Sequence, residues 1–305
     1  MNKHENSGTK PTRPDFFWDA LCDPARRPFA VELDSPAGAD MSGFLTGARM
    51  LRDGGAELLT VADCPFALPR IDASLAVCRV KRELGMNVMP HLTCRDRNRN
   101  ALQALLLGLS AEGVGSILIV TGDPILAELR EEIKGVYNFK NSRELIRFVD
   151  NMNRETLPAP LHIFAALNVN AQSFSIQLEL AKEKEENGAL GFFTQPVLTD
   201  KAMENLMLAR ETLSGKIVGG ILPIVSRQNA LYLNREISGI AVDEETIALY
   251  EGADRARGEE LAVEISSAIA RRMAPFVDGY YLITPFSRTA LIVRIMEEIR
   301  RDMLS

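Results

Sequence analysis

The chain has 305 residues, of which 46% are hydrophobic and 25% are charged, and its formal net charge at pH 7 is −6. This composition is that of an ordinary globular protein, and the length is close to the ~250 residues of one eight-fold barrel with modest insertions. Charges of both signs are spread along the chain without a clustered basic stripe, so nucleic acid is not expected as a partner.

Targeting and cysteine signals are also absent. No run reaches the ~18 apolar residues of a membrane span, and the polar stretch from Met1 to Lys10 lacks the apolar core of a signal peptide. The four cysteines include no Cys-x-x-Cys pair and no histidine at zinc spacing, which predicts reduced thiols and no metal site. We therefore expect a cytoplasmic protein that makes no membrane contact.

Two regions of the chain differ in composition. Residues 1–14 contain Gly, Pro, Ser and charged residues without apolar periodicity, and we expect them to be a disordered tail. Residues 15–305 are expected to form one domain.

Short apolar runs rich in Val, Ile, Leu and Phe alternate with segments of helical period from residue 28 onward, which predicts repeated βα units. Continuous apolar runs are expected of parallel strands that are covered on both faces. The eight predicted strands are Phe29–Leu33, Leu58–Ala62, Asn87–Thr93, Ser116–Thr121, His162–Leu167, Leu190–Thr194, Lys216–Leu222 and Gly279–Thr284.

Eight such units favour a closed (β/α)8 TIM barrel, an α/β fold. An open doubly wound sheet normally has fewer strands and a Gly-rich first turn. The predicted helices include Arg99–Ala111 and Ser142–Asn153. Two insertions follow predicted strands, at residues 124–141 and 237–257. The first is interpreted either as an active-site lid or as a solvated surface loop.

Polar residues gather where the predicted strands end, which is where the βα loops of a TIM barrel build the active site. Glu32 stands within an apolar run. An inward position would bury its carboxyl and raise its pKa, as a general acid near neutral pH requires, whereas a position at the strand edge would pair it with an Arg or Lys.

Three further strand ends carry candidate ligand contacts. Gly122 permits close approach of a ligand, and Asp123 can accept two hydrogen bonds from an amidine-like edge such as that of a pterin, although Gly-Asp-Pro is often only a turn. Gln195 offers a donor and an acceptor to a heterocycle, or is a satisfied core amide. His91 is interpreted as a phosphate or ring contact, because no second ligand stands at metal spacing.

Taken in order, the strand-end motifs resemble those of methylenetetrahydrofolate reductases, in particular the branch that is often fused to a homocysteine methyltransferase, and the resemblance covers the chain from about residue 28 onward. No vicinal cysteine pair of such a fusion partner is present. The motifs are Val-Glu32-Leu-Asp-Ser-Pro36, His91-Leu-Thr-Cys94, Thr121-Gly-Asp123-Pro, Gly135-Val-Tyr-Asn-Phe, Ala166-Leu-Asn168, Thr194-Gln195-Pro, Gly220-Ile-Leu-Pro223 and Pro285-Phe-Ser-Arg288.

This resemblance implies an FAD enzyme that reduces 5,10-methylenetetrahydrofolate to 5-methyltetrahydrofolate with NADH or NADPH. It implies that Glu32 protonates the folate amine N10 and thereby generates the iminium that accepts hydride from reduced flavin. Asp123 would contact the pterin and tune the flavin, while Gln195 and Arg288 would bind the substrate. The residues that the resemblance assigns to the flavin are His91, Thr93, Thr121, Gly122, Asp123, Asn168 and Lys184.

The chain also departs from the better-known bacterial branch of that family. Thr121 stands where that branch has Arg, Asn168-Val-Asn170 replaces a segment with a His, and Ala62-Asp63 lacks the usual Thr. The flavin contacts on that side and the choice of nicotinamide donor therefore stay open.

Two other functions and the assembly state also remain open from the sequence. One alternative is a flavin- and folate-binding subunit that takes electrons from a protein partner. The other is a pterin-binding barrel without a cofactor, such as a methyltransferase or a lyase. A homo-oligomer is compatible with each of these functions.

Overall fold

Eight parallel strands close into a barrel in chain order, and β8 pairs with both β7 and β1. This computed structural model describes residues 15–237 and 239–304. The predicted TIM-barrel fold is confirmed, and each predicted strand matches an observed one with ends that differ by at most two residues. The strands are β1 Phe29–Glu32, β2 Leu58–Val61, β3 Val88–Thr93, β4 Ser116–Val120, β5 His162–Leu167, β6 Gly191–Pro196, β7 Lys216–Ile221 and β8 Gly279–Ile283.

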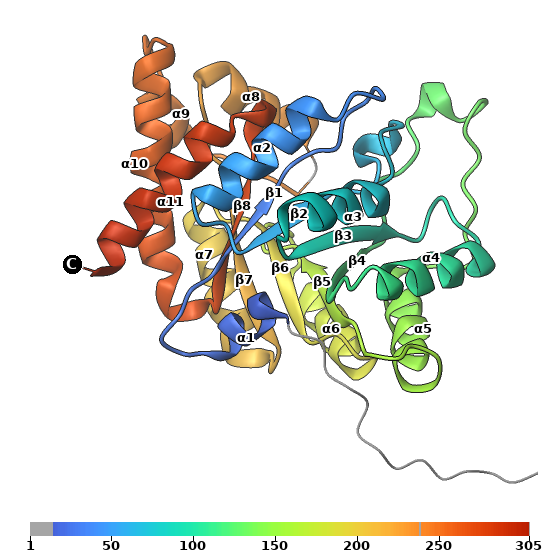
Figure 1. Ribbon diagram of the computed structural model, residues 1–305. Coiled ribbons are helices and arrows are strands. Elements are labelled where there is room, and N and C mark those ends of the chain that lie inside the picture. The colour runs from blue at the N-terminus through green and yellow to red at the C-terminus, as the bar shows by residue number, and fades with distance from the viewer. Residues whose placement is uncertain (1–14, 238, 305) are drawn as a thin grey trace, which may run out of the picture.

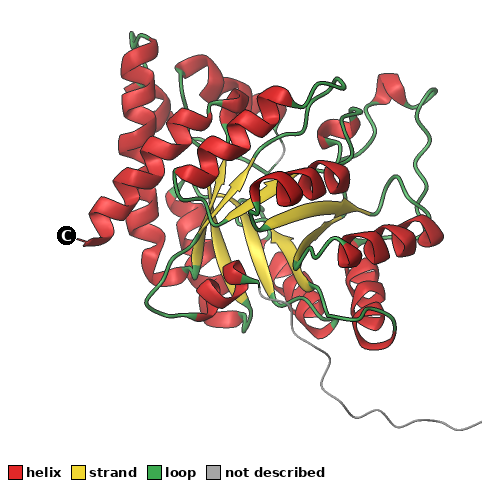
Figure 2. Cartoon of the chain, in the orientation of Figure 1, coloured by secondary structure: helices red, strands yellow, loops and turns green. Residues whose placement is uncertain are grey.

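Helices surround the barrel, as Figure 2 shows by colour. Several begin at a side chain that accepts a backbone N–H, including Asp72 before α3 and Asn98 before α4. The helices that cover the barrel are α2 Ser42–Asp53, α3 Ala73–Leu84, α4 Arg99–Ala111, α5 Ser142–Glu155, α6 Phe174–Glu186, α7 Asp200–Thr212, α8 Arg227–Glu236, α9 Glu244–Leu249, α10 Arg255–Met273 and α11 Thr289–Leu304.

A short helix that the sequence analysis did not predict, α1 (Phe16–Cys22), closes the N-terminal end of the barrel. Phe17 and Leu21 are fully buried there among the inward side chains of the strands. The carboxylate of Asp15 accepts a hydrogen bond from Ser116 Oγ at 2.6 Å and lies 3.0 Å from His162 Nδ1. This end of the barrel is therefore filled, and access to its interior is left at the opposite end.

The two insertions differ in their packing. The segment 237–257 after β7 contains α9 and contributes Val242 and Ile247 to a separate apolar cluster. The segment 124–141 after β4 is largely exposed and extends away from the barrel in Figure 1. Its buried Phe139 packs against Phe148 of α5, with ring centroids 5.1 Å apart.

Two further expectations from the sequence concern the N-terminal tail and the absence of a membrane span. The proposed tail, residues 1–14, lies outside the described residues. Within the described part of the chain, every helix is too short or too polar to span a bilayer.

Candidate functional site

A cavity of about 1030 Å³ opens at the C-terminal ends of the strands, the end opposite to α1. Its wall includes Glu32 and Asp34 from the end of β1, Asp123 from the end of β4 and Gln195 from β6. The loops after β2 and β8 and the helices α2 and α8 complete the wall. The sequence-based expectation that Glu32, Asp123 and Gln195 meet at one rim is thus met by the structure.

Glu32 lies at the inner end of this cavity, with its carboxyl largely buried (side chain 16% exposed). Burial raises its pKa to about 7, and the neighbouring carboxylates of Asp34 and Asp123 act in the same direction. A hydrogen bond from Tyr281 opposes them. Of the two placements considered from the sequence, the structure shows the inward one, and no Arg or Lys pairs with Glu32 among the described residues.

Two buried side chains approach Glu32 from inside the barrel. The hydroxyl of Tyr281 donates a hydrogen bond to Glu32 Oε2, and His91 Nε2 lies 3.6 Å from the same oxygen. Burial lowers the pKa of His91 to about 3, so this imidazole is neutral at physiological pH. Its Nε2 is buried and has no hydrogen-bond partner within the described chain.

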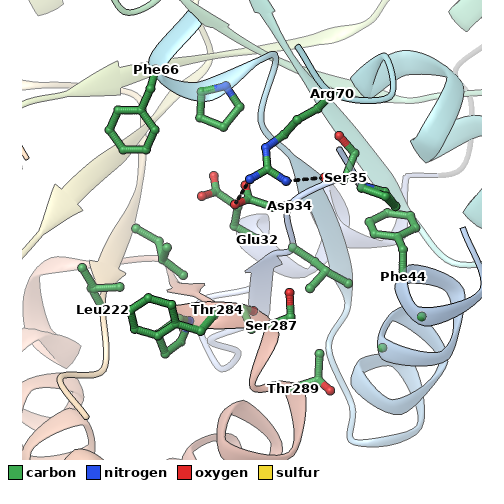
Figure 3. Close-up of a pocket in the computed structure, with 18 of the residues that line it drawn as sticks. Glu32, Asp34, Ser35, Phe44, Phe66, Arg70, Leu222, Thr284, Ser287 and Thr289 are labelled. Carbon is green, nitrogen blue, oxygen red and sulfur yellow. Dashed lines mark hydrogen bonds and ion pairs between the residues drawn. The ribbon is translucent and has the colours of Figure 1, made fainter. Parts of the chain in front are cut away.

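The charged side chains of the cavity lining are predominantly acidic. Its carboxyl groups belong to Glu32, Asp34, Asp40 and Asp123, and Arg70 is the only cationic side chain among the described lining residues. Figure 3 shows Arg70 beside Asp34 and Ser35: its guanidinium donates to the carbonyl of Ser35 at 2.7 Å and lies 3.9 Å from Asp34. Burial raises the pKa of Asp34 despite this guanidinium. The wall therefore suits a neutral or proton-accepting ligand better than a phosphate.

Asp123 reaches the cavity from the turn that follows β4. Gly122 before it has φ +92°, and a Cβ there would lie 3.0 Å from Thr93 Cβ, so the turn requires glycine. The Asp123 carboxylate accepts a hydrogen bond of 2.7 Å from the backbone N–H of Phe66 through Oδ2. Its Oδ1 accepts no hydrogen bond from any other described residue and is available to a ligand.

Two phenylalanines at the cavity wall have unusual backbone conformations. Phe66 and Phe286 have φ values of 57° and 50°, in the left-handed region that residues other than glycine rarely adopt. Each follows a proline in a short 3-10 turn, and their side chains are 44% and 71% exposed. Strain of this kind clusters at binding sites, and here it holds two aromatic rings at the mouth of the cavity.

Gln195 lies on the wall next to these acids. Its side-chain amide makes no hydrogen bond to any other described residue, so it is not the satisfied core amide that the sequence left as an alternative. An amide in this position has both a donor and an acceptor free for a ligand.

Two predicted contacts are engaged elsewhere and do not line the cavity. Thr93 is buried, and its hydroxyl donates to Asp63 at 3.0 Å. Arg288 forms an ion pair with Glu259 of α10 at 3.1 Å. The resemblance did not predict either pairing, because Asp63 and Glu259 come from segments distant in sequence from Thr93 and Arg288.

The remaining predicted flavin residues lie around the ends of β4 and β5. Thr121 is exposed beside Gly122, and Asn168 Oδ1 accepts the backbone N–H of Asn170 at 2.9 Å. Lys184 of α6 donates to the carbonyl of Ala166 at 2.7 Å. Burial lowers the pKa of Lys184 to about 8, with a contribution from nearby Arg143. It forms no ion pair with the described residues.

The structure reveals site residues that the sequence analysis missed, namely Arg70, Tyr281, Phe66 and Phe286. Tyr281 could have been found from the period of the strand, because it stands two residues before the cavity residue Ile283 and shares its inward face. The two phenylalanines had no such signal, since their exposure depends on the loop backbone. No group of three or more His, Cys, Asp or Glu able to hold a metal ion occurs within the described residues.

Comparison with solved structures agrees with the barrel. An uncharacterized protein from Clostridium thermocellum, described as binding two copies of 5-methyl-5,6,7,8-tetrahydrofolic acid, superposes with a TM-score of 0.66 at 10% identity, covering 95% of this chain and 99% of that one. A tryptophan synthase from M. tuberculosis gives a TM-score of 0.55 at 12% identity, with 95% and 99% coverage. At these identities the likeness shows the fold alone.

Comparison at the level of sequence is more specific. No curated protein matches the chain significantly. The sequence profile of the family described as methylenetetrahydrofolate reductase, however, matches residues 25–300, which include every strand of the barrel and every residue of the acidic cavity wall. The chain that places Glu32, Asp123 and Gln195 around this cavity therefore belongs to the methylenetetrahydrofolate reductase family.

Proposed function

We propose that this protein reduces 5,10-methylenetetrahydrofolate to 5-methyltetrahydrofolate with FAD as its cofactor and NADH or NADPH as its electron donor. The observation that carries the proposal is the state of Glu32, a largely buried carboxyl with a pKa of about 7 at the inner end of a cavity large enough for a pterin. A group with this pKa is protonated in part at neutral pH and suits general acid catalysis.

In this proposal, the residues of the cavity have separate roles in proton transfer and in substrate binding. Glu32 donates its proton to the folate amine N10, which opens the five-membered ring of the substrate. Asp123 accepts a hydrogen bond from the pterin through Oδ1, and Gln195 supplies a donor and an acceptor to the same ring. Phe66 and Phe286 present aromatic surfaces to a flat ligand and reduce the access of water.

The residues present fit an FAD whose pyrophosphate lies outside the acidic cavity. Lys184 is a largely buried cation beside Arg143 that lacks an ion-pair partner among the described residues, and an anion would complement it. Thr121 and Gly122 follow β4, and Asn168 follows β5, the strand whose Ala166 carbonyl accepts a hydrogen bond from Lys184. When bound, the reduced flavin would supply the hydride, and the protein supplies its position and the proton.

The absorption spectrum of the purified protein, taken before and after anaerobic addition of NADH and then NADPH, tests this proposal. We expect flavin bands that bleach with one of the two donors and recover when 5,10-methylenetetrahydrofolate is added. A flavin that neither donor bleaches, but that accepts electrons from a protein partner, would contradict the proposal that NADH or NADPH is the electron donor. A colourless protein that does not take up added FAD would contradict the reductase and favour a cofactor-free pterin-binding barrel.

A further inference from the structure

We propose that Tyr281 is a positioning residue for Glu32: from inside the barrel it holds Oε2, so that the acidic proton is carried on Oε1 and presented to the cavity. This inference rests on the proposed role of Glu32 as a proton donor. It assigns a task to a buried tyrosine that does not line the cavity itself.

The geometry distinguishes the two oxygens of Glu32. The Tyr281 hydroxyl donates to Oε2, and His91 Nε2 is also nearest to Oε2, at 3.6 Å. Oε1 makes no hydrogen bond to any other described residue, and Glu32 itself lines the cavity. In a neutral carboxyl, the oxygen that accepts a hydrogen bond is the carbonyl-type oxygen, and the proton is carried on the other. The tyrosine therefore selects Oε1 as the donating atom.

Tyr281 is rigidly held for this task. It faces the barrel interior, where its side chain is 6% exposed and its ring packs edge-on against Phe193 with centroids 5.1 Å apart. Its register partner on β1 is Ala30, one inward-facing position below Glu32, so the phenol reaches up the barrel to the carboxyl. A side chain packed in this way maintains the orientation of Glu32 before any ligand binds.

The hydrogen bond serves both states of the acid. As the proton leaves, the Oε1–H bond breaks, an N–H bond forms on the folate amine, and the electron pair remains on the carboxylate. Tyr281 keeps its own proton and donates to the resulting anion, where the hydrogen bond becomes charge-assisted and stronger. Burial beside Glu32 raises the pKa of the Tyr281 hydroxyl well above its ordinary value, so it remains a donor throughout.

Other groups also face Glu32 and contribute to its titration. Asp34 lies two residues beyond Glu32, past the end of β1; Asp123 comes from the turn after β4, and His91 of β3 is neutral. Arg70, from the loop after β2, pairs with Asp34. Because Tyr281→Phe leaves these titratable groups in place, it removes only the hydrogen bond to Glu32 and the contact of the same hydroxyl with Thr60.

The adjacent Tyr280 provides a matched control. It is fully buried, it lies on the outer face of β8, and its hydroxyl donates to the carbonyl of Ala270 in α10 at 3.0 Å. Tyr280→Phe removes the same chemical group from the same strand without touching Glu32. A loss of activity caused only by disturbance of β8 would occur in both variants.

The titration of Glu32 is best followed by infrared spectroscopy of the protonated carboxyl band, which is assigned by its absence in Glu32→Gln. Loss of a hydrogen bond to a charged group shifts a pKa by about one to two pH units. We expect an upward shift of this size in Tyr281→Phe and none in Tyr280→Phe. The alkaline limb of the folate-reduction profile should move with it, and the maximal rate should fall about tenfold.

These results are separable from the proposed function. An unchanged Glu32 midpoint in Tyr281→Phe, or an equal shift in Tyr280→Phe, would overturn the inference even if the protein is an active reductase. Conversely, the infrared shift tests the Tyr281–Glu32 pair even if the reaction is another one. If Tyr281→Phe does not fold, Glu32→Asp gives a second test, because its shorter side chain withdraws from the phenol and should lose the influence of Tyr281 on the titration.

Discussion

The carboxylate of Asp123 accepts a hydrogen bond from the backbone N–H of Phe66 at 2.7 Å, although the two residues are 57 positions apart in the sequence. This bond joins the turn after β4 to the loop after β2 and supports a left-handed conformation at Phe66. The same carboxylate thus lines the cavity and supports the loop that forms part of its wall.

Removal of this acceptor should loosen the loop around Phe66. We expect Asp123→Ala to accelerate hydrogen exchange of the Phe66 amide by at least about tenfold, because the loss of a charge-assisted hydrogen bond leaves the N–H open to solvent. Asp123→Asn keeps an acceptor oxygen and should show a smaller effect. Exchange measured by mass spectrometry on a peptide that contains residues 64–68 would reveal this order, and equal protection in all three proteins would contradict it.

Substitution of Glu32 should separate the two half-reactions. In Glu32→Gln we expect flavin binding and bleaching by the nicotinamide donor to be retained, while turnover with methylenetetrahydrofolate falls by about 10²–10⁴-fold, the usual contribution of one general acid. Stopped-flow measurement of each half-reaction checks this. Near-normal folate reduction in the variant would rule out Glu32 as the proton donor.

The rate of folate reduction should depend on pH through Glu32. The proposed role makes protonated Glu32 the active form, and its pKa is about 7, so the rate should be highest below pH 7 and should fall about tenfold for each pH unit well above it. Steady-state rates measured at constant ionic strength between pH 5.5 and 9 would show this limb. A profile that stays flat through this range would be inconsistent with a titrating Glu32.

The same carboxyl should lower stability at alkaline pH. Its pKa is about 7 in the folded chain against an ordinary value of 4.5, so its ionisation disfavours the folded state once the pH passes 4.5, and the effect is complete above pH 7. This difference corresponds to about 3 kcal/mol at most. Glu32→Gln should therefore raise the free energy of unfolding at pH 8.5 relative to wild type and leave it nearly unchanged at pH 4. Denaturant titrations at the two pH values test the sign.

Two helical glycines should respond to alanine in opposite directions. A Cβ added to Gly108 of α4 would meet no atom within 4 Å, so Gly108→Ala should stabilise the protein by up to about 1 kcal/mol through helix propensity. In α10, a Cβ on Gly258 would lie 2.5 Å from the carbonyl oxygen of Val225, so Gly258→Ala should lower the melting temperature. Thermal unfolding of both variants provides the comparison, and a stabilised Gly258→Ala would show that this contact relaxes easily.

The fold was predictable because its signal is local and repeated. Each strand contains a short apolar run, and eight of them alternating with amphipathic helices leave few arrangements other than a barrel. Helix α1 was not predicted, because a single short helix before the first strand is not part of the repeated βα pattern. Its role depends on Phe17 entering the far end of the barrel, which is a tertiary contact.

The sequence by itself determined the strands, the barrel and the rim on which Glu32, Asp123 and Gln195 meet, since strand ends in a parallel barrel necessarily lie on one side. Only the tertiary structure decided how each rim residue is used. In it, Arg288 forms an ion pair with Glu259, the Thr93 hydroxyl donates to Asp63, and the Tyr281 hydroxyl donates to Glu32. These pairings depend on distances between side chains from separate segments, and the pKa of Glu32 depends on the burial that those segments create together.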